Sequence, residues 1–567
     1  MFLPTTRKEM QQLSWNTLDV ILVTGDTYID SPFSGIAIIG KVLLQAGYHV
    51  GIIAQPDIYS DHDITRLGEP ELFWGVTGGA VDSMVANYTA LKKKRKTDDF
   101  TPGGLNSRRP DRAVIVYSQL IQKYFKRNKP IVLGGIEASL RRIAHYDYWS
   151  NSIRRSILFD AKADILVYGM GEKQILAIAN QFSANKKLDD ILGICYISSE
   201  KKDNYLELPS YTEVRENNDA FIQMFHDFYI ENDPLHAQGI LQKQDTRYLV
   251  HNPPSRILTT HELDQIYQLD FERSVHPYYR QWGEVKAIET IQFSIPIHRG
   301  CYGDCSFCAI SMHEGKTVSW RSHDSIIEEA RRITYLPNFK GHIFDISGPT
   351  ANMYGYECKK KKTQGACRHK HCLYPAPCNS LPIDHRPQIE LLQKLRNVKN
   401  IKKICLGSAM RDDLVMHDKK NGQNYLREIV QYHVCGQLKI APEHISDHVL
   451  SLMKKPSSDF LNEFKRQFDR FNQTTGKKQY LTYYFIAAHP GCTIKHMLEL
   501  RQFVIKHLHI IPEQVQIFTP TPSTHASVMY YTGINTETHE PIFVEKNLIQ
   551  KAKQKSILTQ KNDSSSS

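Results

Sequence analysis

The chain has 567 residues, of which 41% are hydrophobic and 23% charged, the balance of an ordinary globular protein. No window approaches about eighteen uninterrupted apolar residues, and residues 1–8 lack an apolar stretch, so we expect neither a membrane span nor a signal peptide. We therefore expect a cytoplasmic protein of two or three domains with no membrane partner. The formal net charge of +11 is compatible with an anionic partner but identifies none.

The first part of the chain alternates strand patterns, glycine turns and helix patterns. Strand patterns occupy residues 18–25, 50–54, 130–135 and 164–169. Residues 35–48 have the apolar spacing of an amphipathic helix, and helix patterns also follow the last two strands. This alternation predicts a doubly wound parallel sheet in an amino-terminal α/β domain, residues 1–205.

The glycines that follow these strands have two interpretations. A glycine there lets the phosphate of a ligand approach a helix amino terminus. However, the chain contains no G-x-G-x-x-G motif and no P-loop. We therefore favour close packing of the turns over cofactor binding.

Three cysteines with C-x3-C-x2-C spacing, Cys301, Cys305 and Cys308, form the most specific motif of the chain. Thiolates select zinc or iron–sulfur clusters, and a four-iron cluster held by three thiolates keeps one iron open to another molecule. Structural zinc requires four ligands, so we favour the cluster. The apolar run 291–297 predicts a strand that delivers the cysteine loop at its carboxyl end, where α/β barrels carry their chemistry.

This motif, with Phe307 before the last cysteine, resembles the signature of the radical S-adenosylmethionine (SAM) superfamily. The resemblance implies a [4Fe-4S] cluster on the three cysteines whose open iron chelates the amino and carboxylate groups of SAM. It implies that an electron from the cluster cleaves SAM and releases a 5′-deoxyadenosyl radical, which abstracts hydrogen from a substrate. It also implies a reducing partner such as flavodoxin or ferredoxin. The protein would orient the radical and exclude water from it.

Two further strand patterns end in residues suited to SAM. Ser347, Gly348 and Thr350 occupy the position where related enzymes carry a turn that contacts the SAM amino group, although Ser-Gly-Pro-Thr replaces the usual Gly-Gly-Glu. Ser408 and Arg411 follow the next strand pattern, where a small hydroxyl and a cation suit the SAM carboxylate or ribose. A surface salt bridge is the alternative for Arg411.

The strand pattern that begins at residue 438 ends in Glu443 and His444. Glu443 is a candidate for the ribose or sulfonium side of SAM, and His444 for a proton shuttle. An ordinary turn is the competing interpretation, since Pro442 precedes both residues.

A second set of four cysteines follows: Cys358, Cys367, Cys372 and Cys378. Four cysteines complete a zinc tetrahedron or hold an auxiliary cluster, and unligated thiols are the remaining alternative. The chain has eleven cysteines, and in a large chain without a signal peptide we interpret them as ligands or reduced thiols rather than disulfides.

The segments IQFSIPIHRGC, SGPTANMYG, KIAPEH and HPGCT, together with the extra cysteines, resemble the YgiQ family of radical SAM proteins. The resemblance implies a partial (β/α)6 barrel over residues 287–540 with a cysteine-rich insertion, 358–378. Residues 206–286, polar and proline-containing, are expected to form a helical connection, and 541–567 a basic polar tail. The amino-terminal domain looks like cobalamin-binding folds, but no D-x-H-x-x-G segment supplies a cobalt ligand, so cobalamin is a minority interpretation.

The leading hypothesis is an enzyme that generates the 5′-deoxyadenosyl radical and uses it on an unidentified substrate, RNA or protein. The competing hypothesis is a non-enzymatic iron–sulfur or zinc protein in which the cysteines brace a surface that binds RNA or the ribosome.

Overall fold

The computed structural model describes residues 1–126 and 129–560, and the chain divides into two units. The sheet unit comprises residues 1–258, 262–292 and 312–314, and the barrel unit comprises 259–261, 293–311 and the residues from 315 onward. Within the described residues, no helix is both long enough and apolar enough to cross a membrane.

The sheet unit is built on nine strands in the order β10-β11-β12-β9-β8-β5-β4-β1-β3. Their bounds are β1 Val20–Thr24, β3 Val50–Ala54, β4 Phe73–Thr77, β5 Ile131–Gly134, β8 Ile165–Val167, β9 Ile194–Ser198, β10 Leu206–Leu208, β11 Ile240–Gln244 and β12 Arg247–His251. The run β3-β1-β4-β5-β8 is parallel, whereas β9 and β12 are antiparallel to their neighbours. The interior of the sheet is apolar, as buried parallel strands require.

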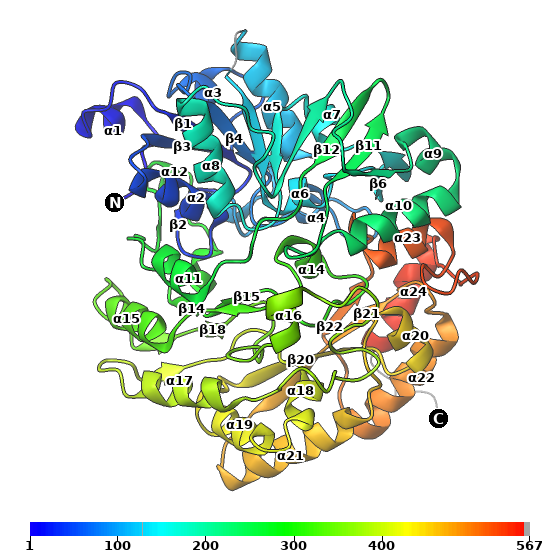
Figure 1. Cartoon of the computed structure of the whole chain (residues 1–567). Coiled ribbons are helices and arrows are strands. Elements are labelled where there is room, and N and C mark those ends of the chain that lie inside the picture. The colour runs from blue at the N-terminus through cyan, green and yellow to red at the C-terminus, as the bar shows by residue number, and fades with distance from the viewer. Residues whose placement is uncertain (127–128, 561–567) are drawn as a thin grey trace. The chain divides into compact units, whose positions relative to one another are not determined.

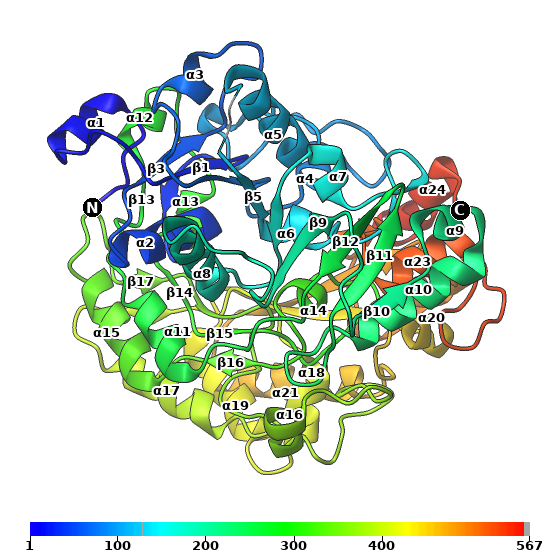
Figure 2. The same ribbon diagram turned by 45° about the horizontal axis from the view of Figure 1, so that its top comes forward.

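Helices cover both faces of this sheet (Figures 1 and 2). Helices α2 (Gly35–Gln45) and α8 (Glu172–Ser183) lie side by side, and α5 (Ala113–Tyr124) packs beside α7 (Ile157–Ala161). The chain leaves β1 in one direction toward β3 and continues from β4 in the other, so the order reverses between β1 and β4. The predicted doubly wound α/β fold is confirmed.

Two parts of the sheet unit differ from the sequence-based expectation. Strand β4, in the middle of the parallel run β3-β1-β4-β5-β8, was not predicted, because Gly75 interrupts its short apolar run. The segment 206–286 is not a helical connection: it supplies β10, β11 and β12 to the sheet. Strands β11 and β12 form an antiparallel hairpin that pairs with β9, so this segment completes the sheet instead of linking two domains.

At the carboxyl ends of β1, β4 and β5 the turns pack against one another without space for a side chain. A Cβ atom at Gly25 would lie 2.3 Å from the carbonyl oxygen of Gly78, and one at Gly78 would lie 2.3 Å from the Glu137 carboxylate. Gly79 has φ +108° and faces Asp26 equally closely. The glycines therefore serve turn packing, the interpretation that the sequence favoured.

Buried ion pairs fill the space behind these turns. Arg109 Nη2 lies 2.8 Å from Asp26 Oδ1 and 3.0 Å from Asp98 Oδ2, and the Arg109 side chain has no exposed surface. Burial raises the pKa of Asp26 to about 6, although Arg109 opposes the shift. A second buried pair joins Arg141 to Asp82. Buried side chains of the protein itself thus lie at the edge where the strand order reverses.

The barrel unit contains six parallel strand segments in chain order (Figure 1). They are β14 Ser294–Pro296, β17 His342–Ile343 with β18 Asp345–Ser347, β19 Lys403–Ile404, β20 Gln437–Glu443, β21 Tyr480–Ala487 and β22 Gln514–Ile517. Strand β14 pairs with β18, β17 with β19, and β20 with β21 and then β22; a bridge between Met410 and Ile440 links the third segment to the fourth. This order is that of the expected partial (β/α)6 barrel.

Two further expectations about this unit are corrected. Residues 541–567 are not simply a tail, because α24 (Leu548–Thr559) packs against α22 (Ile494–Phe503) and β22; residues 561–567 lie outside the described part. Within α24, Gln554 is fully buried and accepts a hydrogen bond from the Ala488 backbone. Cys405 and Cys435 form a disulfide with a Cα–Cα distance of 5.7 Å, because the segments that precede β20 and follow β19 run together.

We predict that Gly25→Ala destabilises the protein whereas Gly35→Ala does not. The added methyl at position 25 meets a backbone carbonyl, and such overpacking costs about 1–3 kcal/mol. Nothing lies within 4 Å of a Cβ at Gly35, the first residue of α2, and alanine is the better helix former there. Denaturant unfolding followed by tryptophan fluorescence measures both variants, and equal stability of the two would contradict the tight turn packing.

Candidate functional site

The three cysteines of the C-x3-C-x2-C motif lie in one loop after β14. Gly300 precedes the loop with φ +85°, and a Cβ there would lie 2.2 Å from the Thr317 carbonyl oxygen, so only glycine fits. The Gly303 backbone donates to Cys301 Sγ at 3.3 Å, and the Cys308 backbone donates to the Cys305 carbonyl at 3.0 Å. The loop therefore presents the three thiols from a fixed backbone.

The thiols interact electrostatically with one another and with nearby cations. Burial, followed by the charges of Cys305 and Cys301, raises the pKa of the Cys308 thiol. Burial also raises the pKa of Cys305, while Lys455 and Arg411 lower it. Three thiols that interact with one another in one loop beside two cations have the chemistry that suits an anionic iron–sulfur cluster, since bound iron would stabilise the thiolates that burial disfavours.

Asp304, inside the motif, holds the loop to a more distant segment. Its carboxylate lies 2.9 Å from His371 Nδ1 and 3.4 Å from Lys316 Nζ. Burial alone would raise the pKa of Asp304, but Lys316, His371 and Lys454 outweigh burial and keep it well below its usual range. Since His371 adjoins Cys372, this contact joins the cysteine-rich insertion to the cysteine loop.

Asp345 organises the ends of β18 and β19, and sequence reasoning did not single it out. It accepts hydrogen bonds from the hydroxyls of Ser347 and Ser408, each at 2.7 Å, and from the Gly407 backbone at 2.8 Å. The two serine hydroxyls also lie 2.7 Å apart. The structure thus brings the predicted Ser347 and Ser408 together around the carboxylate of Asp345. The only sign of Asp345 in the sequence was a polar residue next to a short apolar run.

Gly348 and Thr350 lie in the turn that follows β18. A Cβ at Gly348 would lie 2.5 Å from the His298 ring, so the turn packs on the loop before the cysteines. Thr350 Oγ1 lies 3.5 Å from Cys301 Sγ. This predicted turn therefore borders the first cysteine.

Arg411 is buried and faces the cysteines, so it is not a surface salt bridge. Its guanidinium binds Asp413 at 2.5 Å, and its Nη1 lies 3.9 Å from Cys305 Sγ. The Asn352 side chain fixes the Arg411 backbone: it donates to the Arg411 carbonyl at 2.9 Å and accepts from the Arg411 N–H at 3.0 Å. The position of Arg411 is thus set by residues that the sequence analysis did not identify, Asp413 and Asn352.

Glu443 ends β20 in a left-handed backbone conformation, φ +66°, next to an irregularity in the strand register. Burial raises its pKa, and Lys455 and Arg411 oppose the shift. Lys455 is anchored by the Ala441 carbonyl. An uncommon conformation at a strand end is typical of functional positions, and it aims this carboxyl toward the two cations.

Phe307 and His444 lie in different surroundings. The Phe307 ring packs edge-on against His489 with the ring centres 6.0 Å apart. His444 is fully buried, accepts a hydrogen bond from the Ser446 backbone at 3.0 Å, and has a pKa lowered to about 3 by burial and by His496 and His489. His444 is therefore a core residue, and its role as a proton shuttle stays a prediction.

The second cysteine set is partly assembled. Cys358 and Cys372 pack, with Cys301, against an apolar cluster that includes Tyr302 and Leu373. The Cys378 backbone donates to the Cys372 carbonyl at 2.8 Å, whereas Cys367 is exposed. Among the described residues, no three His, Cys, Asp or Glu side chains are grouped as ligands of a single metal ion, and this holds for the cysteine loop as well as for the second set. The second metal site stays a prediction.

Comparisons with known sequences identify close relatives. The family described as "Radical SAM N-terminal" matches residues 2–294. A UPF0313 protein of Fusobacterium nucleatum is 54% identical over 561 residues, 99% of each chain. A UPF0313 protein of Thermotoga maritima is 50% identical over 98% of each chain, and one of Clostridium botulinum is 45% identical over 98% of this chain and 87% of the relative.

Comparisons with solved structures find the same fold at low identity. The radical SAM methyltransferase TsrM of Kitasatospora setae, solved with tryptophan substrate and a SAM analogue, is 12% identical with a TM-score of 0.50, over 89% of this chain and 75% of TsrM. OxsB, a cobalamin-dependent SAM radical enzyme solved with aqua-cobalamin, is 13% identical with a TM-score of 0.50, over 93% of this chain and 57% of OxsB. These likenesses support the two-part α/β fold.

We predict a pH-dependent role for Asp418, which supports Asn352 through His385. Asp418 accepts hydrogen bonds from the His385 ring and backbone, both at 2.9 Å, and these contacts lower its pKa to about 2 although burial opposes them. Its contribution is therefore present above the unfolded-state pKa near 4 and is lost as pH falls toward 2.

Asp418→Asn should cost about 1–3 kcal/mol of unfolding free energy near pH 7, and the difference from the unmodified protein should shrink as pH falls from about 4 toward 2. Denaturant titrations at each pH measure it. Asp459→Asn, at an exposed aspartate of the same unit, serves as the control. A pH-independent difference would contradict the ionised, hydrogen-bonded state of Asp418.

Proposed function

Because this chain belongs to the UPF0313, or YgiQ, family of radical SAM proteins, we propose that it cleaves SAM reductively at a [4Fe-4S] cluster on Cys301, Cys305 and Cys308. Membership makes it an enzyme of the radical SAM class. When bound, the cluster supplies the electron that splits SAM into methionine and a 5′-deoxyadenosyl radical. The observation that carries the proposal is that the three thiols lie in one loop beside Arg411 and Lys455.

The surrounding residues suit the parts of SAM. Arg411 and Lys455 offset negative charge at the thiolates and at the SAM carboxylate. Asp345 fixes the hydroxyls of Ser347 and Ser408, and its carboxylate is a suitable acceptor for the SAM ammonium group in a turn that lacks the usual Gly-Gly-Glu. Glu443 is a suitable acceptor for the ribose hydroxyls.

Cobalamin is not part of the proposed cofactor set. The neighbours TsrM and OxsB have been solved with cobalamin bound. In this chain the turns after β1 and β4 leave no space for a methyl group at Gly25 or Gly78, and the buried pairs Arg109–Asp26 and Arg141–Asp82 lie beside them. The residues at this edge of the sheet unit therefore do not fit a corrin ring.

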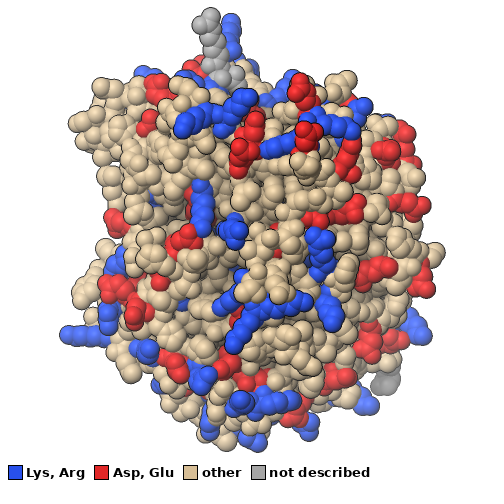
Figure 3. Space-filling view, in the orientation of Figure 1, with Lys and Arg blue, Asp and Glu red and all other residues tan. Residues whose placement is uncertain are grey.

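We propose a polyanion, RNA, as the substrate class in preference to protein. The insertion carries Lys359, Lys360, Lys362, Arg368 and Lys370 on its surface, and residues 358–378 contain no Asp or Glu. Figure 3 shows basic side chains gathered on the face where α16 (Lys359–Gln364) lies in Figure 1. Because His371 fastens the insertion to the cysteine loop, a phosphate backbone held there would pass close to the candidate site.

The reaction also needs an electron from outside the chain. We propose a reducing partner of the flavodoxin or ferredoxin type, and the cytoplasm, where such reductants and reduced thiols occur, as the location.

We predict that the reconstituted protein releases 5′-deoxyadenosine from SAM under anaerobic reducing conditions and that a variant with Cys301, Cys305 and Cys308 changed to alanine does not. Chromatography of the quenched reaction measures the product. Cys195→Ala, at a buried cysteine of the sheet unit, is the matched control and should retain activity. No release from a protein shown to carry about four irons per chain would refute the proposal.

We retain the second cysteine set as a proposed metal site, for zinc or for an auxiliary cluster. Metal analysis should find zinc, or iron beyond the four atoms of one cluster, and serine at Cys358, Cys367, Cys372 and Cys378 together should remove that metal alone. Loss of zinc from the serine variant would assign a structural role to the second site. Loss of iron would assign to it the role of an electron relay or a sulfur source. Unchanged content of both metals would exclude the site.

A further inference from the structure

A basic groove lies at the amino-terminal end of the barrel strands, opposite the end that carries the cysteine loop. Two adjoining hollows of about 520 and 770 Å3 form it. Consecutive residues of one segment line both: Asn397–Asn400 the first and Ile401–Ile404 the second. Because Lys403 begins β19 and Ser408 follows its end, the groove and the candidate SAM site lie at opposite ends of the same strand.

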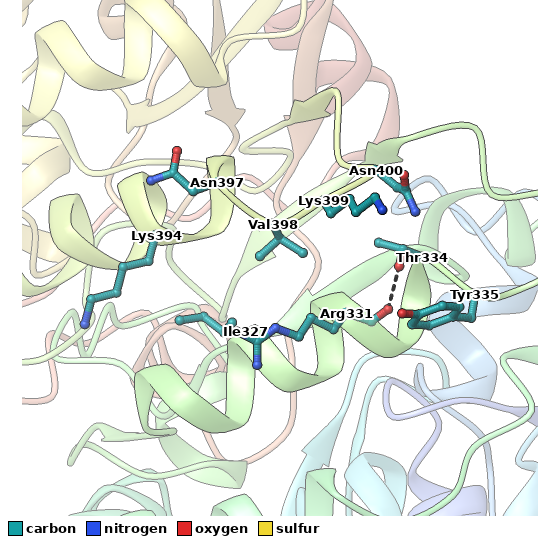
Figure 4. A pocket seen from close by; sticks show the side chains of 9 residues that line it. All are labelled: Ile327, Arg331, Thr334, Tyr335, Lys394, Asn397, Val398, Lys399 and Asn400. Carbon is teal, nitrogen blue, oxygen red and sulfur yellow. Dashed lines mark hydrogen bonds between the residues drawn. The ribbon is translucent and has the colours of Figure 1, made fainter.

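The first hollow combines cations with an exposed aromatic ring. Its side chains come from α15 (His323–Ile333) with the turn after it, and from α17 (Arg386–Arg396) with the segment that follows (Figure 4). Arg331, Lys394 and Lys399 supply positive charge, and the Tyr335 side chain is 85% exposed. The amides of Asn397 and Asn400 add donors and acceptors.

The second hollow is more basic. Arg396, Lys402, Lys403, Arg427 and Lys477 line it, and no Asp or Glu lines either hollow. Arg396 stacks on Tyr432 with its guanidinium 3.7 Å from the ring centre, and it also binds Glu428 at 3.1 Å. The ring and the guanidinium together form a flat, cationic surface.

Several of these cations lack a carboxylate partner. In the part of the chain that the structure describes, Lys399, Lys402, Lys403 and Lys477 form no ion pair. Burial, and then the charge of Lys477, lowers the pKa of Lys403. Positive charges gathered without counter-charges attract a polyanion, and the attraction falls as salt rises.

We propose that this groove binds single-stranded nucleic acid, with phosphates along the lysines and a base stacked on Tyr335. Shallow basic grooves with exposed aromatic rings are the usual surface for a single strand, because every base can stack and every phosphate can pair. A small anion would leave Tyr335 without a role. The inference goes beyond the proposed function: the groove contributes no catalytic residue and tethers a strand away from the candidate active site.

The experiment measures binding of fluorescein-labelled oligouridylate to the full-length protein by anisotropy over a series of salt concentrations. The test variant is Lys399→Glu/Lys402→Glu/Lys477→Glu. The matched control, Lys420→Glu/Lys495→Glu/Lys506→Glu, changes the net charge equally at exposed residues outside the groove. The same titration with oligothymidylate in place of oligouridylate shows whether the groove prefers single-stranded DNA or RNA.

The groove variant should bind more than tenfold more weakly. Its slope of log affinity against log salt should be shallower by about two, since each of the three lost phosphate contacts contributes about 0.7 to that slope. Tyr335→Ala should weaken binding roughly tenfold by loss of stacking. The control should bind as the unmodified protein does. Equal losses in the groove variant and the control would overturn the proposal, as would an absence of binding by the unmodified protein.

Two further measurements separate this proposal from the proposed function. Release of 5′-deoxyadenosine should be unchanged in the groove variant, so a failure of SAM cleavage leaves the binding result interpretable. If Lys359→Glu/Lys360→Glu/Lys362→Glu abolishes binding while the groove variant keeps it, the insertion is the binding surface and the groove proposal is wrong. Complete competition by inorganic tripolyphosphate with no effect of Tyr335→Ala would assign the groove to small anions and overturn it.

Discussion

The barrel unit depends on the burial of negative charge at the carboxyl ends of its strands. Three thiols converge there, and burial disfavours the thiolate form that a metal requires. Arg411 and Lys455 supply the opposing charge, and each is held in place, Arg411 by Asp413 and Lys455 by the Ala441 carbonyl. The cysteine loop can be partly buried and still suit an anionic group because these cations come from other segments of the barrel unit, Arg411 from the loop after β19 and Lys455 from the segment after the helix α20 (Asp447–Leu452).

The need to hold these charges in place also explains why the loops at the strand ends are bound to one another. Asp304 reaches Lys316 and His371, and Asn352 fixes the backbone of Arg411. Asp345 joins the ends of β18 and β19 through two serine hydroxyls. The contacts Asp304–His371, Asn352–Arg411 and Asp345–Ser408 join residues far apart in sequence, so the site is positioned by the whole strand edge and not by the cysteine motif alone.

These long-range contacts also mark the limit of prediction from the sequence. Cysteine spacing and short apolar runs predicted the triplet and the parallel strands, because both are local patterns. Asp345, Asp413 and Lys455 were missed, since an isolated charged residue has no local signal until the strands bring its partner near. The segment 206–286 was misassigned for the same reason: β11 and β12 are recognisable as sheet strands only through their pairing with β9.

The two units use the carboxyl edge of a parallel sheet in opposite ways. In the sheet unit, Gly25, Gly78 and Gly79 let the turns close on one another, and Arg109 neutralises Asp26 in the space behind them. In the barrel unit the corresponding edge presents Arg411 and Glu443 beside the cysteines, and Ser408 beside Asp345. We therefore propose that this fold, which is shared with cobalamin-dependent enzymes, does not carry their cofactor here, because the side chains at a strand edge decide what can occupy it.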